Sequence, residues 1–118
     1  MHQQFQVLNV ALELITTLRP VCERLQQHDR DLARQLRRAA SSVPLCISEG
    51  AQRGGRDRLH LWRVAAGSAA EVRTGLAVAV AWGYVAASDA DNTAALGLLD
   101  RVIAMLWRLT HPSPRPSR

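Results

Sequence analysis

Residues 32–50 read LARQLRRAASSVPLCISEG, and this stretch decides the fold. Its apolar side chains recur at intervals of three and four residues, which places them along one side of an α-helix. They are Leu32, Leu36, Ala39 or Ala40, Val43 and Ile47. Asp29 and Asp31 precede the pattern, and either can cap the helix. Pro44 falls inside it, and we predict a kink rather than an end there, because the period continues to Ile47.

The same spacing predicts a helix on the N-terminal side of this stretch. Its apolar stripe is Phe5, Leu8, Leu12, Ile15 and Leu18. We expect Pro20 to end or bend this helix, because proline lacks the donor that the next turn needs. Residues 21–29 are then an irregular connection.

Two more helices are predicted on the C-terminal side. The first begins at Asp57 as its N-cap, runs to about Trp82, and is followed by Gly83 as the left-handed residue at its end. Its buried face is Leu59, Trp62, Ala65, Ala69, Val72, Leu76 and Ala79. Gly67 and Gly75 inside it indicate that another helix backbone packs very close. The last helix is capped by Ser88 or Asp89, and its stripe is Ala95, Leu98 or Leu99, Val102, Met105 or Leu106, and Leu109.

The composition favours helices over strands. The chain has 118 residues, of which 47% are hydrophobic and 4% aromatic, so its core has to be aliphatic and rich in alanine. That length is enough for one domain with a real core. We predict an all-α fold, an antiparallel up-down four-helix bundle over residues 1–111. The remaining residues 112–118, PSPRPSR, are predicted to be a disordered tail rich in proline and arginine.

The positive charge is concentrated in one part of the chain. The formal net charge is +5, the chain has no lysine, and eight arginines face only three acidic residues between Arg30 and Arg63. Guanidinium groups pair with phosphate bidentately, so this concentration indicates a polyanionic partner. The candidate nucleic-acid-binding residues are Arg34, Arg37, Arg38, Arg53, Arg56, Arg58 and Arg63. Aromatic residues for base stacking are scarce there, and Trp62 is better explained as core, so we expect recognition of backbone or shape.

No pattern in the chain indicates catalysis, a metal or a cofactor. The glutamates are isolated, and none has a histidine three residues on, as a di-metal bundle requires. Glu49 is placed to pair either with Arg53 one helical turn away or with an arginine from another helix. Cys22 and Cys46 are expected to be reduced, buried thiols. The chain has no signal-peptide pattern, and its longest apolar stretch is too short to span a bilayer, so we expect a cytoplasmic protein without a membrane partner.

Two runs of the chain resemble a known family. The first is carried by Gln35, Arg38, Ala39, Ser42, Pro44, Ile47, Glu49 and Gly50, and the second by Ala66, Gly67, Ser68, Glu71, Gly83 and Tyr84. In order and spacing they resemble the four-helix-bundle family of the ribosomal-RNA intervening-sequence proteins, with which the accessory variability proteins of diversity-generating retroelements are grouped. The resemblance covers residues 3–110. Cys46 stands where the family usually has Asn, and Ser48 where it has Ala.

The resemblance implies a bundle that assembles into a homopentameric ring. Its retroelement members use a basic surface to bind nucleic acid and a reverse transcriptase. We therefore expect a non-enzymatic oligomer that binds RNA or DNA through its arginines as a scaffold or accessory factor, with a protein such as a reverse transcriptase as a possible partner. Interface or packing roles are expected for Glu49, Gly67, Ser68, Glu71 and Tyr84. The alternative is a protein-interaction adaptor whose arginines mainly make ion pairs between subunits.

Overall fold

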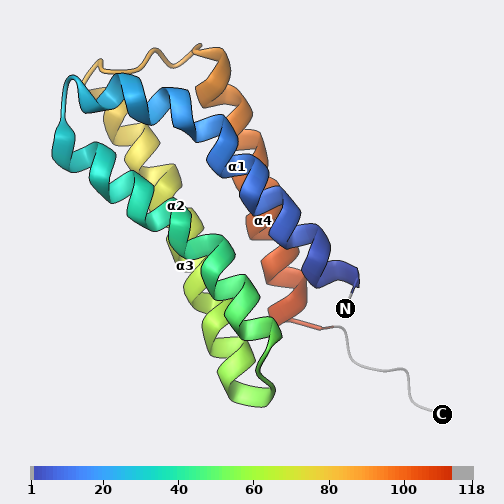
Figure 1. Cartoon of the computed structure of the whole chain (residues 1–118). Coiled ribbons are helices and arrows are strands. Elements are labelled where there is room, and N and C mark those ends of the chain that lie inside the picture. The colour runs from blue at the N-terminus through green and yellow to red at the C-terminus, as the bar shows by residue number, and fades with distance from the viewer. Residues whose placement is uncertain (1, 113–118) are drawn as a thin grey trace.

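The structure is a computed structural model that describes residues 2–112. Four α-helices follow one another: α1 (His2–Gln26), α2 (Arg30–Ala51), α3 (Gly55–Ala81) and α4 (Ala90–Thr110). Short connections join them, so that neighbouring helices run antiparallel (Figure 1). α1 and α3 each pack mainly against α2 and α4, and they lie diagonally opposite one another. The body is elongated, at 57 × 23 × 19 Å. The all-helical, four-helix expectation is confirmed.

The core is aliphatic and runs the length of the bundle. Its largest fully buried side chains include Leu14, Leu25, Leu36, Ile47, Leu76, Leu99 and Leu106. The predicted inner face of α2 is buried throughout. The predicted faces of α3 and α4 are also correct, although Leu59, Met105 and Leu109 are only half-buried at their edges. Trp62 is buried in this core, as expected.

α1 differs from the prediction in both length and orientation. It continues through Pro20 to Gln26, so the irregular connection predicted over 21–29 is wrong. The predicted stripe is also wrong, because Phe5 and Leu12 are exposed. The buried residues are Val7, Val10, Ala11, Leu14, Leu18, Val21, Cys22 and Leu25. The turns after Pro20 carry the last three of these, and their burial holds the helix together although proline removes one hydrogen bond.

The caps of the helices set where each one starts. Asp29 accepts a hydrogen bond from the backbone N–H of Leu32 at 3.0 Å, which confirms it as a cap. Asp89 caps α4 in the same way through Asn92 at 2.9 Å. α3 begins before Asp57, the residue predicted to cap it; its N-cap is Gly54.

Glycines make the turns and one close helix contact. Gly55 and Gly83 have φ of +58° and +80°, a region that favours glycine, and Gly83 is the predicted left-handed residue. A Cβ on Gly75 would lie 2.5 Å from Cδ2 of Leu36, so the space beside Gly75 is filled by the Leu36 side chain of α2 and not by a helix backbone as predicted. Gly67 has open space instead, so the close contact predicted for it is absent within the described bundle.

Pro44 lies inside α2, which continues beyond it to Ala51. The kink at Pro44 stays a prediction. Residue 112 is the last one described, so the tail predicted over 112–118 lies almost entirely outside the described residues.

α3 has an unusual distribution of apolar residues. By length and composition alone it is long and apolar enough to cross a membrane, a property that core helices of soluble proteins share. Of the 18-residue stretch of α3 that is most apolar, 28% is buried inside the bundle. The large apolar side chains of α3 that are exposed are Val64 and Val78. The expectation of no membrane partner stays a prediction.

Candidate nucleic-acid interface

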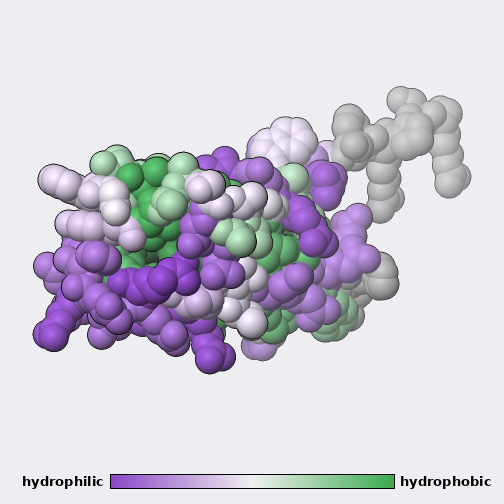
Figure 2. Space-filling model, turned by 90° about the horizontal axis from the view of Figure 1, so that it is seen from above, coloured by the Kyte–Doolittle hydropathy of each residue, from purple (hydrophilic) through white to green (hydrophobic). Residues whose placement is uncertain are grey.

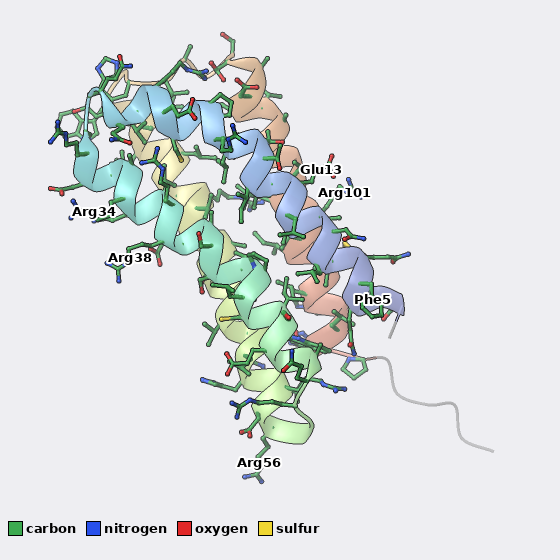
Figure 3. All side chains as sticks on the ribbon, viewed as in Figure 1. Phe5, Glu13, Arg34, Arg38, Arg56 and Arg101 are labelled. Atoms are coloured by element: carbon green, nitrogen blue, oxygen red, sulfur yellow. The ribbon has the colours of Figure 1, made fainter. Side chains whose placement is uncertain are left out.

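The seven candidate arginines form two separate groups. Arg34, Arg37 and Arg38 lie in the first half of α2, and the other four surround the connection between α2 and α3. At 1.5 Å per helical residue, Arg38 and Arg53 are about 22 Å apart along the bundle, and Arg63, two turns into the antiparallel α3, is about 14 Å from Arg38. In Figure 3, Arg34 and Arg38 extend from the outer side of α2, whereas Arg56 lies at the far tip of the molecule. A single continuous field of seven arginines is therefore not formed within one chain.

Arg34 and Arg38 of the first group lie on the outer face of α2 together with Arg30. Arg30, Arg34 and Arg38 are four residues apart, so they share this face, and we call them the α2 arginine row. All three are exposed, and none has an ion-pair or hydrogen-bond partner in the described part of the chain. Arg37 faces α1, where its Nη1 donates to Oε1 of Gln26 at 2.6 Å. Arg30 was absent from the predicted set although the sequence places it within the basic stretch.

Arg53, in the second group, has acidic partners that compete with phosphate for its guanidinium. Arg53 donates to Glu49 at 3.1 Å, as predicted, and lies 3.8 Å from Asp57. Both contacts are exposed, so each contributes under about 1 kcal/mol. Arg56 and Arg63 are exposed and have no such partner among residues 2–112.

Arg58 is part of the corner between α2 and α3. Its Nε donates to the carbonyl of Gly50 and its Nη2 to that of Ala51, each at 3.1 Å. Both carbonyls belong to the last turn of α2, where carbonyls lack partners within the helix. The Gly50 carbonyl also accepts from the backbone N–H of Arg53 at 3.1 Å, so Arg58 gives it a second donor and gives Ala51 a donor as well. Its guanidinium also lies over the buried ring of Trp62, 5.5 Å from the centroid. Arg58 is half-buried and occupied by these contacts, which separates it from the exposed arginines.

A polar groove runs between the outer sides of α2 and α3. It is lined by Gln35, Arg38, Ala39, Ser42, Ser68 and Glu71. Ser68 donates to Ser42 across the two helices at 2.9 Å, and the Ser42 hydroxyl lies 3.6 Å from Sγ of Cys46. The structure thus brings together polar residues from both runs that carry the family resemblance. Glu71 is exposed in this groove and has no ion-pair partner among the described side chains.

Three aromatic rings stack at the end of the bundle where α2 begins. His28 stacks on Tyr84 with centroids 5.2 Å apart, and Trp82 stacks on Tyr84 with centroids 6.3 Å apart. Tyr84, expected to serve packing, is half-buried in the middle. The sequence prediction missed this cluster because its members come from two different connections. The local signal in the sequence is that two aromatic residues, Trp82 and Tyr84, flank Gly83.

The two thiols have different surroundings. Cys22 is buried between α1 and α2, and burial raises the pKa of its thiol; Arg37 opposes this shift and Glu23 adds to it. Cys46 is only half-buried, so the expectation of a buried thiol is wrong there. Among the described side chains, which begin at residue 3, no three of His, Cys, Asp or Glu come together to hold a metal ion.

Comparison with known proteins shows which fold and which family this chain has. A crystal structure of a protein of unknown function from the S23 ribosomal protein family of Bacteroides thetaiotaomicron matches with a TM-score of 0.79. The match covers 88% of this chain and 97% of that one at 18% identity, so it establishes the fold alone. No curated protein matches the chain. The likeness to retroelement accessory proteins stays a prediction. The family model of the 23S rRNA-intervening sequence proteins matches residues 3–108, and the chain therefore belongs to that family.

Proposed function

We propose that this protein is a non-enzymatic, cytoplasmic, oligomeric helical bundle that binds RNA or DNA as a scaffold or accessory factor. The observation that carries the proposal is the α2 arginine row, whose three guanidiniums are exposed and without partners in the described chain. A protein partner such as a reverse transcriptase belongs to the same proposal.

The geometry of the row suits a phosphate backbone. Successive arginines are one helical turn apart, which is about 6 Å along the axis. Each guanidinium keeps its paired donors free for phosphate oxygens. Asp31 is the only acidic residue from 30 to 38, so the local charge is strongly positive. Contacts of this kind position a nucleic acid without reading its sequence.

Self-association is the second part of the proposal, and exposed apolar surface supports it. Val64 and Val78 are exposed on the outer side of α3, and Phe5 and Leu12 on that of α1. Figure 2 shows apolar surface exposed between hydrophilic side chains on the face that it displays. Because α1 and α3 lie diagonally opposite, contact between them in successive copies is head-to-tail, which closes into a ring if the rotation fits. We propose the homopentameric ring that the resemblance implies.

The adaptor alternative has its own supporting observation. Arg38 and Glu71 line the same groove, and neither has an ion-pair partner within the described residues. In the adaptor hypothesis such groups pair with a neighbouring subunit. Arg38 is then covered on assembly and does not contribute to nucleic-acid binding.

The test is fluorescence anisotropy with labelled RNA and DNA at several salt concentrations. We expect the double substitution Arg34→Gln and Arg38→Gln to weaken binding at least roughly tenfold, because charge-assisted hydrogen bonds are lost. It should also lower the salt slope by about 2. The matched control, Arg56→Gln with Arg63→Gln, removes the same charge from the other end of the bundle and should have a much smaller effect.

Light scattering on the same samples reports the assembled mass. Absence of binding by the intact oligomer at low salt would rule out the nucleic-acid proposal. Equal losses in the two double variants would show that only net charge matters. Dissociation of the Arg34 and Arg38 variant into monomers would favour the adaptor.

A further inference from the structure

The stacked rings lie directly beside the α2 arginine row. His28 precedes Arg30, the first member of the row, by two residues. Trp82 follows the end of α3, which runs antiparallel to α2. The ring of Tyr84 lies between those of His28 and Trp82 and stacks on both. One end of the bundle therefore carries both a ladder of aromatic rings and the start of a line of free guanidiniums.

Backbone hydrogen bonds anchor both connections that carry these rings. The amide of His28 donates to the carbonyl of Leu25 at 2.9 Å. On the other side, Gly83 takes its left-handed turn and the amide of Tyr84 donates to the carbonyl of Ala79 at 2.9 Å. Both connections are thus tied back to the helices that they follow, which fixes the backbone positions from which the rings extend.

The outer ring of the ladder is open to solvent. Trp82 is 69% exposed, although tryptophan is one of the side chains with most to gain from being covered. Tyr84 is half-buried and supports the indole on one side through the stacked contact, with an interplanar angle of 18°. A planar partner on the remaining surface of Trp82 would extend the ladder by one more ring.

We propose that Trp82 is a stacking platform for an unpaired base, and that the ligand is a single-stranded nucleic acid whose phosphates follow the α2 arginine row. This inference rests on the proposed function and specifies its ligand. A positively charged track with exposed aromatic rings is how single strands are bound without sequence preference. The bases of an intact duplex are paired and stacked on each other, so they cannot use the platform. Asp31, exposed in the first turn of α2, opposes phosphate there.

The experiment compares Trp82→Ala with Trp107→Ala as a matched control. Trp107 is 58% exposed and stacks on His111 at 4.4 Å, but it lies near the end of α4, at the opposite end of the bundle. The probes are a short labelled single-stranded RNA, the same RNA in a duplex, and a single strand of equal length with abasic sites. The abasic strand keeps the phosphates and removes the bases.

We expect Trp82→Ala to weaken binding of the single strand by about 5- to 100-fold, the range that stacking of a base on an aromatic ring produces. Binding of the duplex and the abasic strand should not change. Trp107→Ala should behave as the unsubstituted protein, and Trp82→Phe should restore part of the affinity. Asp31→Asn should tighten binding of all three probes.

Other outcomes overturn the inference and distinguish it from the proposed function. If Trp82→Ala and Trp107→Ala have equal effects while Arg34→Gln with Arg38→Gln weakens every probe, the arginine row binds but the platform does not exist. If Trp82→Ala lowers the assembled mass in light scattering, Trp82 is a subunit contact. If the unsubstituted protein binds no probe, both proposals fail.

Discussion

A single added methyl group at Gly50 tests the corner between α2 and α3. Gly50 is buried, and a Cβ there would lie 2.7 Å from both Cδ1 and Nε1 of Trp62 and 3.3 Å from Cβ of Leu61. The indole cannot move away freely, because its Nε1 donates to the carbonyl of Ile47 at 3.2 Å and Arg58 covers its ring. Gly50→Ala therefore has to displace a rigid, buried ring.

Three effects set the change in the free energy of unfolding: one raises it and two lower it. Alanine is a better helix former than glycine by about 1 kcal/mol. Overpacking a buried site costs about 1–3 kcal/mol, and a buried indole N–H that loses its acceptor costs about 1–3 kcal/mol. We expect Gly50→Ala to lower the free energy of unfolding by about 1–5 kcal/mol. For a domain of this size, each kcal/mol corresponds to about 4 °C in Tm.

The assay is urea denaturation followed by far-UV circular dichroism at one fixed protein concentration, because self-association would add to the apparent stability. The control is Gly97→Ala in α4, where an added Cβ meets nothing within 4 Å. It should raise the free energy of unfolding by up to about 1 kcal/mol, through helix propensity alone. If Gly50→Ala is as stable as the unsubstituted protein, Trp62 is not fixed at this corner and the reasoning is refuted.

Four further predictions concern single side chains. Arg58→Gln should lower the free energy of unfolding by about 1–3 kcal/mol, because the end of α2 loses its hydrogen bonds, whereas Arg56→Gln should stay within about 0.5 kcal/mol in the same denaturation assay. Asp89→Ala removes the cap of α4 and should cost about 1 kcal/mol, measured as a lower Tm. Burial raises the pKa of the Cys22 thiol, so a thiol reagent at neutral pH should react first with Cys46, and Cys46→Ser should abolish the fast phase. The stability linked to protonated Cys22 is fully present below the ordinary pKa of a thiol, and a denaturation series should show its loss as pH rises through the raised pKa.

Most of the fold could be predicted from the sequence, because most of the helices carry one unambiguous apolar stripe. In α2 a single set of positions meets the helical spacing, and the structure buries all of it. In α1 two sets meet it, one through Phe5 and Leu12 and the other through Val7 and Leu14. Local spacing cannot choose between them. The choice follows from which side packs against α2 and α4, a contact between segments distant in sequence.

For the candidate site, the sequence predicted only the segment in which positive charge is concentrated. The sequence located the arginines, but it could not show that Arg58 turns back onto the carbonyls that end α2. That contact depends on the path of the chain through Gly54 and Gly55. The stacked rings could not be predicted for the same reason, since His28 and Tyr84 stack only when the two connections share one end of the bundle.

The sequence by itself determined the helical class, the four segments and the concentration of arginine between 30 and 63. These properties depend on residue type and spacing within a few turns of chain. The tertiary structure alone decided which side of α1 is buried, which arginines stay free, and which polar side chains share the groove between α2 and α3. Each of these depends on contacts between helices, and helix–helix packing selects among faces that are locally equivalent.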